Sequence, residues 1–129
     1  MPPKLIGVLE TCLYVADTER SQRWYEEIFG LSLIASDGTR LRAMQVKEAQ
    51  LLLLFKKGGS PDHDGAGQNH LAFATSVADL PVWERWLAEH GIVIEERKQW
   101  SYGGHSIYFR DPDGHLLELA TPGIWPGFF

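Results

Sequence analysis

Hydrophobic and polar positions fall into two successive series of elements with the same order. In the first series, alternation over 6–15 predicts a strand, and apolar residues at helical spacing then lead to a stop at Gly30. Three further strands are expected at 31–36, 41–46 and 50–55. The second series predicts a strand at 68–75, a helix at 77–90, a strand at 92–97 and a hairpin over 108–120. The chain therefore contains two copies of one unit, a strand, a helix and three more strands.

The last strand of the second series carries a carboxylate where the pattern expects an apolar residue. Residues 111–114, Asp-Pro-Asp-Gly, have the composition of a tight turn, so the runs on either side predict a hairpin. On the return strand Glu118 shares a face with Leu116 and Ala120. An unpaired charge there is costly. We therefore expect a compensating partner, either a bound cation or a basic side chain such as Arg110.

The repeat places four positions in register, because Glu10 corresponds to His70 and Leu53 corresponds to Glu118. One unit alone exposes a curved sheet with a helix on its back, so two units complete each other by pairing their sheets. The predicted fold is α+β, with two βαβββ modules forming a cup-shaped mixed sheet and the helices outside. Small side chains on the same faces leave room for a ligand, namely those of Ala72, Ala74 and Ala120.

Composition narrows the class of protein. The 129 residues, 44% hydrophobic and 22% charged, predict one folded domain, with modules at about 5–56 and 68–122, a linker at 57–67 and a tail at 123–129. A net charge of −5 without a basic block argues against nucleic acid and anionic membranes. No apolar run is long enough to span a membrane and no signal peptide is evident, so we expect a cytoplasmic protein. Cys12 is the only cysteine, which excludes an intrachain disulfide.

Several segments together resemble the vicinal oxygen chelate superfamily of glyoxalases, bleomycin-resistance proteins, fosfomycin-resistance proteins and extradiol dioxygenases. The matching segments are 9–17 with Trp24 and Tyr25, Phe-Gly-Leu at 29–31, His-Leu-Ala-Phe-Ala at 70–74, and 108–122. The resemblance covers about 5–122. It implies a glyoxalase-like fold of paired modules, a cup-shaped site for a small molecule, and a homodimer.

In metal-using members of this superfamily, the ligands come from the first and last strands of each module. Carried over by position, these sites are Glu10, Leu53, His70 and Glu118, of which all but Leu53 can bind a metal. Two carboxylates and an imidazole suit Mn²⁺, Fe²⁺, Co²⁺, Ni²⁺ or Zn²⁺. Taken singly, His70 also fits a core histidine bonded to a backbone carbonyl, and Glu10 fits an edge-strand charge that faces water.

The resemblance implies a metal-dependent lyase, isomerase or thiol transferase that chelates two oxygens of a small substrate. Glu10 or Glu118 would then transfer a proton. Loop residues near the cup are candidate substrate contacts, namely Trp100, Tyr102 and His105. Aromatic residues of the tail, Trp125, Phe128 and Phe129, are candidates for ligand or dimer contacts. The alternative function is a bleomycin-resistance-like protein that sequesters a small molecule in an aromatic crevice without catalysis.

Overall fold

The computed structural model describes the chain except for residues 7, 60–64, 66 and 128, and it divides into two compact units, Met1–Gly67 and Gln68–Phe129. His63 and much of the linker expected at 57–67 lie outside the described residues, as does Phe128. Each unit has one helix and one four-stranded mixed sheet, which confirms the α+β prediction. Neither helix of the described chain has the length and apolar character that a membrane crossing requires.

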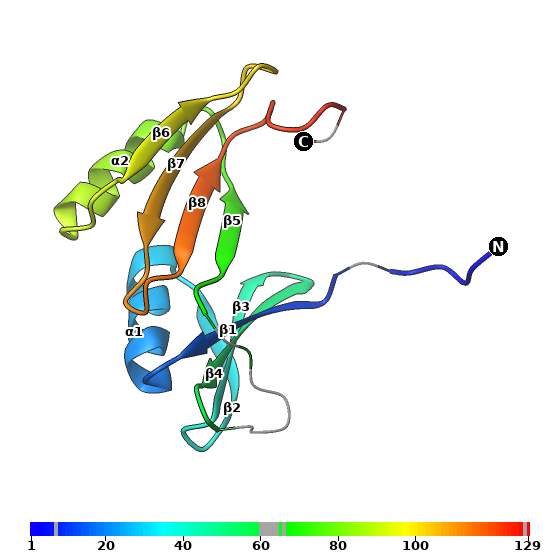
Figure 1. The fold of residues 1–129 in the computed structure, drawn as a ribbon, viewed down its shortest axis with the longest axis vertical. Helices are drawn as coiled ribbons and strands as arrows, with labels where there is room; N and C mark the ends of the chain where they lie inside the picture. The colour runs from blue at the N-terminus through cyan, green and yellow to red at the C-terminus, as the bar shows by residue number, and fades with distance from the viewer. Residues whose placement is uncertain (7, 60–64, 66, 128) are drawn as a thin grey trace. The chain divides into compact units, whose positions relative to one another are not determined.

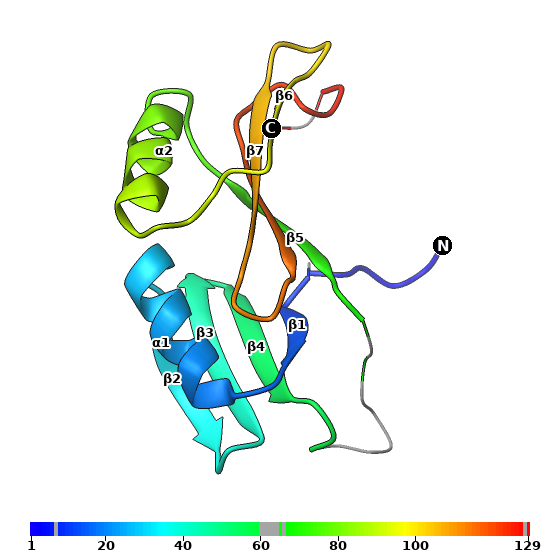
Figure 2. The same ribbon diagram turned by 60° about the vertical axis from the view of Figure 1, so that its left-hand side comes forward.

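The first unit contains four strands and a helix in the predicted order. These are β1 (Glu10–Val15), α1 (Thr18–Phe29), β2 (Ser32–Asp37), β3 (Leu41–Lys47) and β4 (Gln50–Lys56). Strand β1 runs parallel to β4, whereas β3 is antiparallel to both β4 and β2. The strand order is therefore β1-β4-β3-β2. Figure 2 shows α1 along one face of this sheet.

The second unit repeats this topology. Its elements are β5 (His70–Ala74), α2 (Leu80–Glu89), β6 (Glu96–Gln99), β7 (His105–Arg110) and β8 (Leu116–Ala120). The strand order is β5-β8-β7-β6, with β5 parallel to β8 and the other pairs antiparallel. Figure 1 shows β8 in the interior of this sheet, between β5 and β7. The internal repeat predicted from the sequence is confirmed.

Local sequence signals explain where α1 begins and ends. The Asp17 side chain accepts hydrogen bonds from the backbone N–H groups of Glu19 and Arg20, which lack partners within the helix. The helix ends at Phe29 and is capped by Gly30, whose φ of 66° lies in the left-handed region. Tyr25 and Ile28 are buried, so the predicted apolar face does cover the sheet.

Several predicted boundaries were wrong, among them the start of the hairpin, which is His105 and not residue 108. The second helix begins at Leu80 and not at 77, because Pro81 is tolerated only in the first turn of a helix. The strand expected at 92–97 is β6, Glu96–Gln99, because the Ile92 N–H instead bonds the Leu87 carbonyl and closes the helix. The first strand begins at Glu10 and not at residue 6.

The turn between β7 and β8 sets the position of the last strand. The Asp111 carboxylate accepts hydrogen bonds from the backbone N–H groups of Asp113 and His115, and the Gly114 N–H donates to the Asp111 carbonyl. Gly114 has a φ of 82°, which glycine adopts without strain. The predicted hairpin is confirmed, with β8 beginning two residues after this glycine.

Candidate metal and ligand site in the second unit

Strand register brings three polar side chains to one face of the second sheet. On β8, Glu118 lies opposite Ala72 of β5 and opposite Tyr108 of β7. His70 is two residues before Ala72, so its side chain shares that face. Glu118 is only 6% exposed, whereas His70 is exposed. The sequence prediction that Glu118 is a carboxylate within an apolar strand is confirmed.

The positions of the His70 and Glu118 side chains suit a metal ion held by both. His70 Nδ1 is 3.1 Å from the Leu116 carbonyl oxygen, which can only accept, so Nδ1 carries a proton. His70 Nε2 is 3.1 Å from Glu118 Oε1. In a neutral imidazole this nitrogen would direct a lone pair at a carboxylate oxygen, which is repulsive. A metal ion bound by both atoms, or a proton on either of them, removes this repulsion. Imidazole nitrogen and carboxylate oxygen are both ordinary metal ligands.

The second oxygen of Glu118 is held by a buried hydroxyl. Ser106 Oγ donates a hydrogen bond of 2.6 Å to Glu118 Oε2, and Ser106 is 1% exposed. The Trp100 indole N–H donates to the same Ser106 oxygen at 2.9 Å. This chain of two hydrogen bonds fixes Oε2 and leaves Oε1 facing His70. Arg110, considered from the sequence as a partner for Glu118, instead pairs with Glu95 at 3.0 Å.

Tyr108 adds a proton donor beside the carboxylate. Partial burial, followed by the charge of Glu118, raises the pKa of the Tyr108 phenol above its ordinary value. The phenol is therefore protonated at neutral pH. Its ring also stacks near the His70 imidazole, with ring centres 6.1 Å apart.

A buried histidine anchors the backbone next to His70. The Asn69 N–H donates to His115 Nδ1 at 3.0 Å, and His115 is fully buried. The Leu116 N–H donates to the Asn69 carbonyl at 2.9 Å. These two bonds attach the start of β5 to the start of β8, and so they set the approach of His70 to Glu118.

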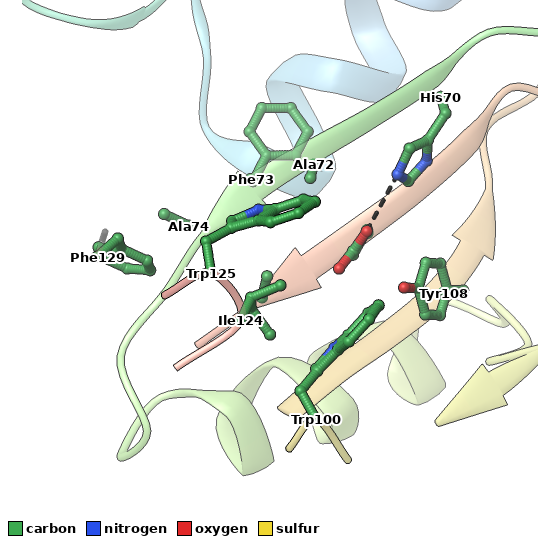
Figure 3. Close-up of a pocket in the computed structure, with 11 residues that line it drawn as sticks. His70, Ala72, Phe73, Ala74, Trp100, Tyr108, Ile124, Trp125 and Phe129 are labelled. Atoms are coloured by element: carbon green, nitrogen blue, oxygen red, sulfur yellow. Dashed lines mark ion pairs between the residues drawn. The ribbon is translucent and has the colours of Figure 1, made fainter. Parts of the chain in front are cut away.

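A cavity of about 660 Å³ opens over this polar group (Figure 3). Its floor carries the three predicted alanines, Ala72, Ala74 and Ala120. Its polar surface comes from His70, Glu118 and Tyr108, while aromatic side chains from other segments form much of the rest. Trp100 precedes β7, and Trp125 and Phe129 belong to the tail. A volume of this size accommodates a small organic molecule.

Two residues predicted as substrate contacts, Tyr102 and His105, do not line this cavity. Tyr102 is 62% exposed and absent from its walls, and His105 lines a separate cavity of about 240 Å³ beside α2. Glu10 belongs to the first unit, so its participation remains a prediction. Among the described residues of the second unit, no third His, Cys, Asp or Glu completes a metal-binding group with His70 and Glu118.

Sequence reasoning missed two members of the site, Ser106 and Tyr108. A signal for both was present, because β7 pairs with β8 and residues two apart on a strand share a face. Once Glu118 is assigned to the ligand-facing side, its cross-strand neighbour Tyr108 and the next residue on that face, Ser106, follow from the register.

Comparison of the sequence with known proteins relates the chain to one protein superfamily. Residues 7–119 match the family model of the Glyoxalase/Bleomycin resistance protein/Dioxygenase superfamily. A protein named metallothiol transferase FosB from Bacillus licheniformis is 30% identical over 124 residues, covering 95% of this chain and 79% of that protein. The protein of the same name from Staphylococcus epidermidis strain ATCC 12228 is 28% identical over 119 residues, covering 92% and 83%.

A solved structure shares the fold over the full length of the chain. The crystal structure of lactoylglutathione lyase from Agrobacterium tumefaciens superposes with a TM-score of 0.87 and 28% sequence identity. The alignment covers 99% of this chain and 100% of that one. The repeated topology described above is therefore a glyoxalase-like fold.

Proposed function

The chain belongs to the Glyoxalase/Bleomycin resistance protein/Dioxygenase superfamily, and we propose that it is a divalent-metal-dependent enzyme acting on a small oxygen-rich substrate. His70 and Glu118 would hold the ion together with Glu10 of the first unit. The observation that carries this proposal is the 3.1 Å approach of His70 Nε2 to Glu118 Oε1, with Nδ1 committed to the Leu116 carbonyl. The similarity to metallothiol transferases FosB supports it.

When bound, the ion supplies Lewis acidity to two neighbouring oxygens of the substrate. Its identity among Mn²⁺, Fe²⁺, Co²⁺, Ni²⁺ and Zn²⁺ is open, because a set of one imidazole and two carboxylates suits all of them. Leu53 occupies the position where similar enzymes carry a fourth ligand, so the site has fewer protein ligands and more room for substrate oxygens. The reaction class is lyase, isomerase or thiol transfer, in a cytoplasmic homodimer.

The side chains have separate tasks in this proposal. Ser106 holds Glu118 Oε2, which would leave Oε1 to bind the ion. Tyr108, protonated at neutral pH, donates a hydrogen bond to a substrate oxygen beside Glu118. Glu10 is exposed, and its carboxylate accepts a 3.8 Å hydrogen bond from the Cys12 thiol, which is weaker than the 2.6 Å bond from Ser106 to Glu118. We therefore assign Glu10 the proton transfer and Glu118 a secondary part in it.

The decisive experiment measures metal binding in two ways. Elemental analysis gives the metal content, and thermal unfolding of protein freed of metal by a chelator is followed as each of the five ions is added. We expect one equivalent to bind and stabilise the wild type, and Glu118→Gln to abolish this effect. Glu89→Gln, an exposed carboxylate on α2, is the control of equal charge change. Failure of all five ions to bind would overturn the proposal.

A sequestering protein is the second candidate, favoured by the aromatic lining of the cavity. It predicts tight binding of an aromatic ligand that is unaffected by chelators and by Glu118→Gln. The enzyme proposal predicts that ligand affinity depends on the ion. The same two variants, titrated with and without EDTA, separate the two functions.

A further inference from the structure

The cavity over Glu118 has a polar end and a much larger apolar part. The polar groups, from His70, Glu118 and Tyr108, gather on neighbouring strands, and the remaining walls are alanine, isoleucine and aromatic side chains. Trp125 and Phe129 are 66% and 57% exposed although they line the cavity. Much aromatic surface is therefore still available to be buried by a ligand.

The charges around this cavity do not match an anionic ligand. No lysine or arginine is found among the described residues that line it. The nearby Lys98 ammonium lies 4.0 Å from the centre of the Trp100 ring, and Arg110 pairs with Glu95. The proposed ligand set adds no excess of positive charge, because two carboxylates and a neutral imidazole cancel a divalent ion. An anion such as a phosphonate would meet no lysine or arginine among the described lining residues and would depend on the ion for its charge partner.

The backbone approaches itself closely at Gly104 and Gly123, in the two segments that carry Trp100 and Trp125. We call this approach the crossing. The Gly104 N–H donates to the Gly123 carbonyl at 3.0 Å. A Cβ at Gly104 would lie 2.7 Å from the Gly123 carbonyl carbon, and one at Gly123 would lie 2.7 Å from the Gly104 nitrogen. Only glycines allow this approach. Figure 3 shows Trp100 and Trp125 reaching the cavity from these different segments.

We propose that this site selects an uncharged substrate with a flat apolar body and two adjacent oxygen donors at one end, and that Trp125 in the tail is its specificity-determining residue. Only one part of this inference, the requirement for two adjacent oxygen donors, rests on the proposed function. The selection for the apolar body depends on the cavity walls, so it can be tested with or without an ion.

Three probes separate these contributions. Each is titrated by calorimetry into protein freed of metal by a chelator and into the same protein with Zn²⁺ added, an ion that does not oxidise the probes. The probes are catechol, 2,3-dihydroxynaphthalene and fosfomycin, which differ in apolar area and in charge. Burial of the second ring should make the naphthalene diol bind roughly tenfold more tightly than catechol, with and without Zn²⁺. Fosfomycin should bind more weakly than either diol.

Trp125→Ala should weaken binding of the naphthalene diol roughly tenfold and leave Zn²⁺ affinity unchanged. Trp86→Ala, which removes an exposed ring of α2 outside the cavity, is the control. Gly123→Ala should weaken the same probe more than Gly127→Ala, because both have positive φ but only the former meets another segment. This comparison separates the effect of the close backbone approach at Gly123 from the effect of placing alanine at a positive φ.

Fosfomycin binding as tightly as the naphthalene diol would overturn the inference, as would equal affinity for the two diols. Unchanged probe affinity in Trp125→Ala with an altered oligomeric mass would assign the ring to a subunit contact and also overturn it. If no ion binds but the naphthalene diol still binds more tightly than catechol, the proposed metal-dependent enzyme is excluded and the proposed selection by the cavity walls is retained.

Discussion

The two units place very different side chains at equivalent positions of the same sheet. In the first unit Tyr14 of β1 pairs in register with Phe55 of β4, and their rings stack with centres 5.5 Å apart. In the second unit the equivalent register pair is Ala74 and Ala120, and both line the cavity. In the first sheet two aromatic rings fill the space that, in the second sheet, stays open for a ligand.

The same contrast surrounds the buried carboxylate. By register, the counterpart of Glu118 is Leu53, which is 8% exposed. On the neighbouring strand, Tyr108 corresponds to Ala43 and Ser106 corresponds to Leu41. A polar side chain on β7 therefore has an apolar counterpart on β3 at each of these two positions. Topology provides the positions, and the side chains alone decide which unit can hold a charge.

The largest effect is expected from giving the first unit the carboxylate of the second. In Leu53→Glu, measured with EDTA present, a charge would be buried where Leu41 replaces the serine donor. We expect a loss of roughly 4 kcal/mol in unfolding free energy at pH 7. Burial raises the pKa of such a carboxyl, so the loss appears as pH rises above its unfolded pKa and shrinks toward pH 4.

Leu53→Gln is the matched control, because it has nearly the same shape and no charge. Urea unfolding at pH 7 and pH 4 measures both variants. The glutamate variant should be the less stable at pH 7 and should approach the glutamine variant at pH 4. Equal stability at pH 7 would mean that position 53 tolerates a charge as well as position 118 does.

The second prediction gives the second unit the aromatic pair of the first. Ala74→Tyr with Ala120→Phe should fill the cavity and weaken binding of 2,3-dihydroxynaphthalene by about a hundredfold. Zn²⁺ affinity should persist, because His70 and Glu118 are unchanged. Ala78→Tyr adds a ring at an exposed position outside the cavity and should have little effect. Retained probe binding in the double variant would show that these alanines do not set the cavity's volume.

The repeat explains why the fold was predictable and much of the site was not. Apolar spacing, the Gly30 stop and the turn at 111–114 are local signals, and each was confirmed. The choice of partners for Glu118 depends on which side chains of neighbouring strands reach it. Alternation shows which residues share a face, but it could not distinguish Arg110 from Ser106 as the partner.

The tail and the second helix show the same limit in another form. No periodicity marks 123–129, so the positions of Ile124, Trp125 and Phe129 in the cavity wall follow from the close backbone approach at Gly104 and Gly123. The apolar run beginning at Ile92 resembled a strand, yet its first residue closes α2. Pro81 did carry a local signal for the helix start. The tail and the end of α2 were therefore harder to predict than the repeated patterns.

The third prediction concerns Ser106, which we treat as a positioning residue. Ser106→Ala removes the 2.6 Å hydrogen bond to Glu118 and should weaken Zn²⁺ binding roughly tenfold. Ser106→Thr keeps the hydroxyl and should retain most of the affinity. Competition with a chromogenic chelator measures the affinity, and thermal unfolding without metal measures any general loss of stability. Equal Zn²⁺ affinity in the alanine variant and the wild type would contradict this role.

The smallest effect concerns Cys12, whose counterpart in the second unit is Ala72 beside Glu118. Burial, followed by the charge of nearby Glu10, raises the pKa of the Cys12 thiol above its ordinary value. Less thiolate is then present at pH 8, so iodoacetamide should react several-fold more slowly with Cys12 than with free cysteine. Glu10→Gln should restore only part of the rate, because burial is the larger cause. Rates followed by mass spectrometry from pH 7 to 10 test this, and full recovery in Glu10→Gln would instead make Glu10 the dominant cause.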